Sequence, residues 1–381
     1  MNCFGRDVAS GAVFEVAFHH AIESVAPSNE SSGLYVAPGF IDIQVNGFAG
    51  VDYNNPATSH EEIDRSLRVL FSTGVTRFYP TVITGPRDRM AGALRNLAAA
   101  REALVDGEVM DGFHVEGPFI CAEDGPRGAH PKQWVRRPDI DEYRGWQDAT
   151  GGRIRIVTLS PEWPEANRFI EQITADGVVA SIGHTHATAA QIRDAVSAGA
   201  MLSTHLGNGA HGVMRRHPNY IWDQLAEDRL MADFIVDGIH LDAAFLKVAL
   251  RAKTVDRSVL VTDAATPAAA APGRYYLGDQ VVDHTADGRV VLAGQDRLAG
   301  SALRMDRGVE NLMRLAGLSL AEAVQMATVN AARAGKAPGR SAGLAAGDRA
   351  DLVQFRYEAG RIEVAAVWMS GRQVYPRSFV I

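Results

Sequence analysis

Five short apolar runs in this chain each end on a residue that can bind a metal ion or transfer a proton. They span Gly112–Glu116, Val179–His184, Ala200–His205, Phe234–His240 and Val259–Asp263. An apolar run of this length is typical of a buried strand in a parallel sheet. In a closed barrel of such strands, the carboxyl ends open onto one face, where catalytic residues gather. We therefore predict that these five polar residues meet in a single metal-dependent hydrolytic site.

The composition is that of an ordinary globular enzyme, with 46% hydrophobic and 22% charged residues in 381. A formal net charge of −7 argues against nucleic-acid binding, which needs concentrated Lys and Arg. No stretch approaches the roughly 20 apolar residues of a membrane span, and we see no signal peptide. The two cysteines do not make a disulfide framework. We expect a cytoplasmic enzyme that acts on a small molecule.

The order of apolar patterns along the chain predicts the architecture. Strand-like runs alternate with helical patterns from about Val36 to Gly335, which indicates repeated βα units. Alternating apolar and polar residues at both chain ends indicate antiparallel strands. We predict a (β/α)₈ barrel at residues 37–335 and a small β-sandwich domain built from residues 1–36 and 336–381. The alanine-rich segment Ala264–Ala271 is expected to be a mobile loop.

Glu116, His184 and His205 are the candidate metal ligands. One carboxylate and two imidazoles suit zinc or another borderline divalent ion and leave a position open for water. The alternative is that each is a hydrogen-bonded structural residue, which is common for a lone His after a strand. His114 lies two residues before Glu116, so it faces the same side of the strand and is interpreted as a residue of the barrel interior or one that supports a metal ligand.

Asp263 is the candidate general base. An unperturbed Asp has a pKa near 3.9, and a nearby dication lowers it further, so the side chain should be ionised at neutral pH. It could then take a proton from metal-activated water. The alternative is a structural Asx turn or N-cap.

Seven motifs together resemble those of the N-acetylglucosamine-6-phosphate deacetylases, a family of the amidohydrolase superfamily. They lie at Pro38–Gly47, His114–Pro118, Gly183–Thr185, Thr204–Leu206, Asp237–His240, Val261–Asp263 and Leu298–Ser301. The resemblance runs from about Ala37 to about Gly335, and Gly343–Val353 matches the usual C-terminal ending of the superfamily. It implies removal of the acetyl group from the nitrogen of an amino-sugar phosphate.

The resemblance also bears on the number of metal ions. Two-metal relatives carry His-x-His where this chain has Gln44-Val-Asn46, and amides are poor ligands beside imidazoles. This implies one divalent ion, with Gln44 and Asn46 in auxiliary positions. Zinc is favoured, although iron, cobalt and manganese would suit the same ligands.

Substrate contacts are implied in the same way. The resemblance assigns His130 to stabilising the oxyanion, beside Ala129, and it assigns Arg216 to the phosphate group. It implies a homodimer, in which some phosphate contacts cross from the partner subunit. The remaining matched substrate positions are Asn208, Gly209, Asp237, His240, Leu298, Ala299 and Gly300.

The chain departs from the family pattern in two places, of which the first lies in the expected substrate-binding segment. The family reads His-x-x-Asn-Ala-Met and Arg-Glu-Pro-Gly where this chain reads His205–His211 and Arg215–Asn219. His186 stands where the family has a non-ligand residue, and an extended segment would place it on the same side as His184. We interpret His186 as a loop residue near the site, with an auxiliary metal as the alternative.

These departures leave other functions open. The chain could hydrolyse an unphosphorylated or different N-acetyl sugar, an N-acyl amino acid or a cyclic amide. It could also be a metal-binding relative without catalytic activity, although binding alone would not need Asp263. A purely structural barrel is the third alternative, which the five polar strand ends argue against.

Overall fold

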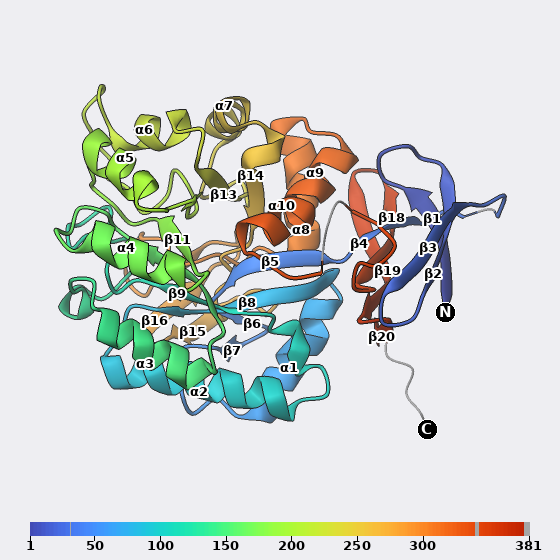
Figure 1. Ribbon diagram of the computed structural model, residues 1–381, viewed down its shortest axis with the longest axis horizontal. Helices are drawn as coiled ribbons and strands as arrows, with labels where there is room; N and C mark the ends of the chain where they lie inside the picture. Colours follow the sequence, from blue (N-terminus) through green and yellow to red (C-terminus); the bar gives the residue numbers. More distant parts are fainter. Residues whose placement is uncertain (31, 340–342, 377–381) are drawn as a thin grey trace.

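An eight-stranded parallel sheet forms the centre of the larger part of the molecule, as the computed structural model shows (Figure 1). The structure describes residues 1–30, 32–339 and 343–376. Along the sheet the order is β14-β13-β12-β11-β10-β9-β8-β5, and every pairing is parallel. The strands are β5 (Phe40–Val45), β8 (Val75–Ile83), β9 (Phe113–Glu116), β10 (Ile154–Leu159), β11 (Val179–Ile182), β12 (Leu202–Ser203), β13 (Met231–Ile235) and β14 (Ser258–Val261).

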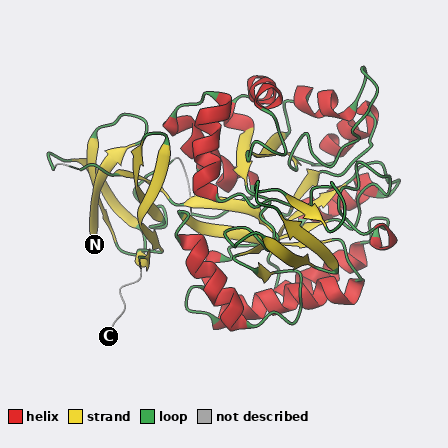
Figure 2. Cartoon of the chain, turned by 180° about the vertical axis from the view of Figure 1, so that it is seen from behind, coloured by secondary structure: helices red, strands yellow, loops and turns green. Residues whose placement is uncertain are grey.

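Helices follow the strands in turn and surround them, as Figure 2 shows. Apolar residues of the strands and of the inner helix faces form one large core between the two layers. The helices are α1 (His60–Phe71), α2 (Arg87–Ala103), α3 (Ile140–Thr150), α4 (Ala166–Ala175), α5 (Ala189–Ser197), α6 (Tyr220–Ala226), α7 (Ala243–Lys253), α8 (Met305–Asn311), α9 (Leu320–Ala327) and α10 (Val329–Ala334).

The sheet closes between its first and last strands. Val45 and Ala264 form a parallel bridge, and the Asn46 amide donates to the Ala264 carbonyl at 2.7 Å. The predicted (β/α)₈ barrel is therefore confirmed. The interpretation of Ala264–Ala271 as a mobile loop is wrong at its start. Ala264 also bridges Ser301, and Ala264, Ala265 and Ala268 are fully buried, because their small side chains allow this segment to pack against the barrel.

Strands from both chain ends form a second sheet, in the order β20-β19-β18-β4-β1-β2-β3. The Phe18 and Trp368 rings lie 5.8 Å apart although their strands are not neighbours in the sheet, so the sheet curls over its own core. This confirms the predicted small β unit; residues 31, 340–342 and 377–381 of its predicted range lie outside the described residues. Its strands are β1 (Asn2–Asp7), β2 (Val13–Phe18), β3 (Ile22–Pro27), β4 (Tyr35–Pro38), β18 (Leu352–Glu358), β19 (Arg361–Met369) and β20 (Arg372–Tyr375).

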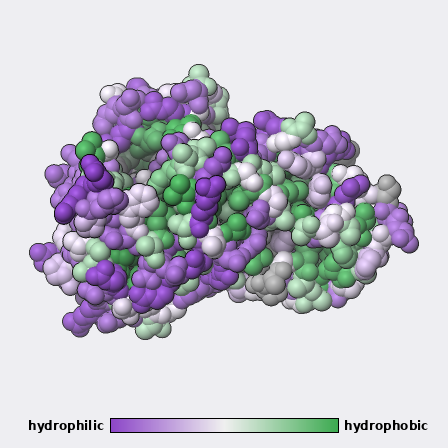
Figure 3. Space-filling view, turned by 90° about the horizontal axis from the view of Figure 1, so that it is seen from above, coloured by the Kyte–Doolittle hydropathy of each residue, from purple (hydrophilic) through white to green (hydrophobic). Residues whose placement is uncertain are grey.

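A buried ion pair joins the two units. Arg77, at the start of β8, is fully buried, and its Nε lies 2.6 Å from Oδ2 of Asp351, beside β18. Its Nη1 lies 3.2 Å from Oδ2 of Asp111. Hydrophilic side chains cover much of the barrel seen from above, while the small unit at the right shows more hydrophobic surface (Figure 3). No helix within the described ranges is long and apolar enough to cross a membrane.

A short antiparallel sheet over the barrel mouth was not foreseen from the sequence. It contains β15 (Gly273–Leu277), β16 (Gln280–His284) and β17 (Val290–Leu292), and a separate ribbon pairs β6 (Gly47–Phe48) with β7 (Val51–Asp52). The Gln280 side chain donates to the Ala129 carbonyl, and Leu277 lines the cavity described below. This sheet therefore covers one side of the candidate site.

Candidate active site

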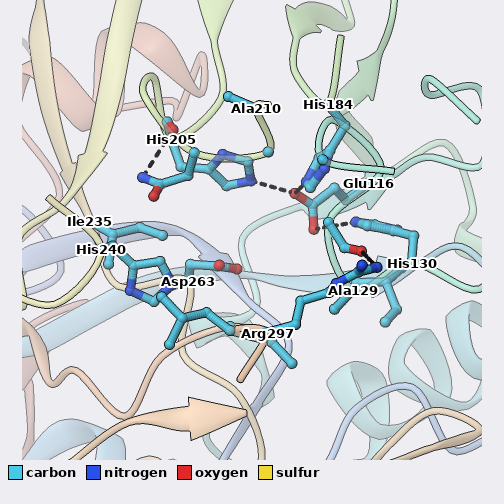
Figure 4. A pocket seen from close by; sticks show the side chains of 18 of the residues that line it. Glu116, Ala129, His130, His184, His205, Ala210, Ile235, His240, Asp263 and Arg297 are labelled. Atoms are coloured by element: carbon cyan, nitrogen blue, oxygen red, sulfur yellow. Dashed lines mark hydrogen bonds and ion pairs between the residues drawn. The ribbon is translucent and has the colours of Figure 1, made fainter. Parts of the chain in front are cut away.

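A cavity of about 580 Å³ opens at the carboxyl ends of the barrel strands (Figure 4). Its volume falls in the range of small-molecule sites, roughly 300–1,000 Å³. Most of the residues expected at the site line it, namely Asn46, Glu116, Ala129, His130, His184, His205, Asn208, Gly209, His240, Asp263, Leu298, Ala299 and Gly300.

The other expected residues are not part of this lining. His114 is buried inside the barrel, where its ring nitrogens contact the Ile43 carbonyl at 3.0 Å and Thr158 Oγ1 at 2.7 Å. Asp237 Oδ2 lies 2.7 Å from His240 Nδ1 and so orients a lining residue. Arg216 is exposed and is not part of the lining. Gln44 and His186 are described below.

Three polar residues of the site have a left-handed backbone. The φ angles are +50° at His184, +29° at His205 and +49° at Asp263. Non-glycine residues adopt such angles at a cost, and they cluster at functional sites. The expectation that His184 and His186 lie on one side of an extended segment is therefore wrong. The turn at His184 separates them: His184 faces Glu116, and His186 faces Glu123.

Glu116 and His184 face each other in a way that calls for a cation. His184 Nδ1 lies 2.8 Å from the Pro126 carbonyl oxygen, which can only accept, so Nδ1 carries the hydrogen. In the neutral ring, Nε2 then presents a lone pair to Glu116 Oε1 at 3.1 Å. Two lone pairs at this distance repel unless a proton or a metal ion lies between them. A carbonyl that fixes the tautomer of an imidazole is also typical of metal-binding His.

His205 approaches the same carboxylate oxygen. Its Nε2 lies 2.9 Å from Glu116 Oε1. Although burial opposes the charged form, Glu116 raises the pKa of His205 to about 9. Burial likewise opposes ionisation of Glu116, yet the imidazoles of His184 and His205 that face it hold its pKa well below the ordinary value. The buried carboxylate thus requires positive charge beside it, and the residue types fit a divalent cation.

His130 is a further imidazole in this cluster. Its Nε2 lies 3.8 Å from Glu116 Oε2, and the ligand atoms of Glu116, His130 and His184 all lie within 4.8 Å of one another. Its Nδ1 lies 2.8 Å from Thr84 Oγ1. Burial, followed by the charge of His184, lowers the pKa of His130 to about 3, so the ring is neutral. A neutral ring with Thr84 donating to Nδ1 would carry its hydrogen on Nε2, which faces the cavity.

Asp263 is held by two amide side chains. Asn46 Nδ2 donates to Asp263 Oδ1 at 2.7 Å, and Gln44 Nε2 donates to the same oxygen at 3.0 Å. Gln44 Nε2 also donates to Glu116 Oε1 at 3.0 Å. Both amides bind Oδ1, which leaves Oδ2 available for a proton. Gln44, in β5, and Asn46, directly after it, therefore hold the Asp263 carboxylate in position.

The pKa of Asp263 differs from the sequence expectation. Burial, followed by the negative charge of Glu116, raises it to about 6 rather than lowering it below 3.9. The sequence expectation considered the dication but not burial. Asp263 is only 7% exposed, so its desolvation is nearly complete. A pKa near 6 still leaves the carboxylate largely ionised at pH 7, and a bound dication acts in the opposite direction to burial.

Arg297 also lines the cavity, and the sequence analysis missed it. Its Nη1 donates to the Gly128 carbonyl at 3.1 Å and lies 3.7 Å from Asp124 Oδ1. Its place directly before the expected segment Leu298–Gly300 was the available signal. Arg297 is the only Lys or Arg among the lining residues within the described part of the chain, so it is the natural partner for an anionic group there.

The sequence matches a family model and curated enzymes. The model of the amidohydrolase family matches residues 35–374. N-acetylglucosamine-6-phosphate deacetylase from Lysinibacillus sphaericus is 32% identical over 339 residues, covering 87% of this chain and 86% of the relative. N-acetylgalactosamine-6-phosphate deacetylase from Escherichia coli O157:H7 is also 32% identical, over 354 residues covering 92% and 91%.

Solved structures have the same fold. A variant of N-acetyl-D-glucosamine-6-phosphate deacetylase from Mycobacterium smegmatis, in complex with N-acetyl-D-glucosamine-6-phosphate, is 31% identical with a TM-score of 0.86. The match covers 95% of this chain and 94% of that one. The Thermotoga maritima N-acetylglucosamine-6-phosphate deacetylase is 26% identical, with a TM-score of 0.85 and coverage of 98% and 99%.

Proposed function

Because this chain belongs to the amidohydrolase family, we propose that it hydrolyses the acetamido group of an N-acetylhexosamine 6-phosphate, releasing acetate and the free amine. The observation that carries the proposal is the buried Glu116 carboxylate, which two imidazoles approach at 3.1 Å and 2.9 Å beside the amide-tethered Asp263. The curated relatives named for this reaction support the substrate class.

We propose that Glu116, His184 and His205 hold one divalent ion, most simply zinc. Such an ion lowers the pKa of a bound water towards about 7 and polarises the amide carbonyl. Asp263 takes the proton of the attacking water on Oδ2, because Oδ1 is occupied by Asn46 and Gln44. It then gives this proton to the nitrogen as the C–N bond breaks.

His130 and His240 bind the substrate in this proposal. The Nε2–H of neutral His130 donates to the carbonyl oxygen as it gains negative charge, which is the arrangement that stabilises an oxyanion. His240 lines the cavity across from His130 (Figure 4) and is oriented by Asp237. Asn208 and Gly209 follow His205, and Gly209 packs so closely that a Cβ there would lie 2.7 Å from His184 Nδ1.

A substrate panel tests the proposal. Acetate release is measured with N-acetylglucosamine 6-phosphate, N-acetylgalactosamine 6-phosphate, the two unphosphorylated sugars and an N-acetyl amino acid. We expect the highest kcat/KM for a 6-phosphate. The match to a relative named N-acetylgalactosamine-6-phosphate deacetylase makes the galactosamine isomer the second candidate. A higher kcat/KM for an unphosphorylated sugar or the amino acid would contradict the proposal.

Arg297→Gln should weaken recognition of the phosphate group. A hydrogen bond to a charged group contributes about 1.5–3 kcal/mol, so we expect KM for the phosphorylated sugar to rise about 10- to 150-fold. KM for the unphosphorylated sugar should barely change. Arg274→Gln, an exposed arginine of β15 paired with Asp283, is the matched control. Equal loss on both sugars would assign Arg297 to loop structure instead.

We also propose that the enzyme is a cytoplasmic homodimer in which Arg216 serves the partner's phosphate site. Arg216 is exposed and outside its own cavity, so the role expected for it requires a second copy. Val213 and Trp222 nearby are 92% and 48% exposed, which suits a surface covered by a partner. Light scattering should give twice the mass of the chain, and a monomer that is fully active would contradict the proposal.

A further inference from the structure

A second cluster of residues that can bind a metal ion lies near the cluster of Glu116, His184 and His205. Glu123, His186 and His211 present ligand atoms that all lie within 4.8 Å of one another. His186 Nδ1 lies 3.1 Å and His211 Nε2 lies 3.3 Å from the same oxygen, Glu123 Oε2. The donor atoms of a tetrahedral zinc site lie about 3.3 Å apart, given bond lengths of about 2.0–2.2 Å. The cluster therefore needs little movement to hold an ion.

The three residues belong to the loops that also carry the inner cluster. Glu123 follows Glu116 by seven residues, His186 follows His184 by two, and His211 follows His205 by six. The order Glu, His, His of the inner cluster is thus repeated further along the same three loops. Figure 4 shows the inner cluster, and the lining of its cavity extends outward to His211.

Neighbouring groups hold two of the three side chains in position. The Tyr220 hydroxyl accepts from the His211 backbone amide at 2.8 Å and lies 2.9 Å from Nδ1 of the same residue. When Nδ1 donates to this hydroxyl, Nε2 keeps a lone pair for a metal ion. The backbone amide of His186 donates to Glu162 Oε2 at 2.9 Å, which fixes the turn that presents the ring.

Charge and access also favour a cation. Among the described residues no Lys or Arg pairs with the Glu123 carboxylate, whose ion-pair partners are the two imidazoles. The side chains of Glu123 and His186 are 58% and 52% exposed, so an ion can enter from solvent and water can complete its coordination. Glu123 also lies on the loop that ends at His130, so an ion there would restrain that loop.

We propose that Glu123, His186 and His211 form a second divalent-cation site, of zinc type, that ties together the three loops following β9, β11 and β12. The site lies at the rim of the cavity and takes no part in the chemical step. Its expected effect is structural: occupancy limits the motion of the loop segment 117–130 relative to the other two loops. This inference does not depend on the identity of the substrate.

Zinc stoichiometry tests the site in the intact protein. After equilibrium dialysis against micromolar zinc, the wild-type chain should hold two equivalents by elemental analysis, and His186→Ala should hold one. Glu123→Gln keeps the size of an exposed side chain and should also hold one. His217→Ala removes an exposed imidazole from the same loop as His211 and should still hold two.

Two further measurements distinguish the rim from the inner cluster. Hydrogen exchange of segment 117–130 should slow when zinc is added to the wild-type chain, and it should not change in His186→Ala. Glu116→Ala should keep one equivalent, and adding His186→Ala to it should remove that equivalent. One equivalent in the wild-type chain, or two in both rim variants, would overturn the proposal.

Discussion

Asp263→Asn is expected to lower kcat by about 10²–10⁴-fold while the protein keeps its metal and its fold, the range typical of losing a general acid–base group. Asparagine has nearly the same shape, and its oxygen can still accept from Asn46 and Gln44, which now bind Oδ1 at 2.7 Å and 3.0 Å. What it lacks is a site for a proton. Steady-state acetate release and elemental analysis on the same sample measure both quantities.

The control for this variant is Asp242→Asn. Asp242 caps α7 by accepting from the Phe245 amide, and asparagine caps helices equally well, so this substitution should leave kcat unchanged. If Asp263→Asn kept more than a tenth of the wild-type kcat with metal bound, Asp263 would not be the base. If it lost the metal as well, Asp263 would have to be counted among the ligands.

Glu116→Ala is expected to abolish binding at the inner site and to reduce acetate release below detection. Both His184 and His205 face Glu116 Oε1, so this carboxylate supplies the negative charge of the cluster and joins its two imidazoles. Two neutral imidazoles alone bind a divalent ion far more weakly. The variant is best made in a His186→Ala background, so that the rim cluster contributes no metal.

Elemental analysis then gives a simple outcome. The His186→Ala parent should contain one equivalent and the double variant almost none. Glu116→Gln, which keeps the size of the side chain but removes its charge, should behave like Glu116→Ala. One full equivalent in either Glu116 variant would show that the ligand set is wrong.

The sequence could predict the site residues that lie at the ends of barrel strands. Glu116 ends β9, and His184, His205 and Asp263 follow β11, β12 and β14 within two residues. Because a parallel barrel brings its carboxyl ends together, the strand pattern alone places these residues at one mouth. Their assignment as ligands and base remains a prediction, which the variants above test.

The orientation of side chains beyond the strands could not be predicted. Alternation assumes an extended backbone, and the positive φ at His184 breaks it, so His186 turns towards Glu123. The tether from Gln44 to Asp263 joins residues more than two hundred positions apart. Such contacts follow from how the barrel closes, which no local pattern encodes. The burial that raises the pKa of Asp263 likewise depends on the closed barrel.

The local composition led to a wrong prediction for the alanine-rich segment, and it did not indicate that Arg297 lines the cavity. A run of alanines reads as a loop, yet Ala264 forms bridges to both Val45 and Ser301. Arg297 lies in a polar turn after β17, where nothing in the local sequence indicates that it faces a cavity. Both are set by packing of distant segments against the barrel mouth.

The sheet made from both chain ends has a consequence for synthesis on the ribosome. β4 pairs with β1 on one side and with β18 on the other, and β18 begins only at Leu352. At about 5–20 residues per second, the nascent chain exposes the open edge of β4 for roughly 15–60 seconds before its partner emerges. A chain cut short before Leu352 would keep that edge permanently, and an open strand edge is a template for aggregation.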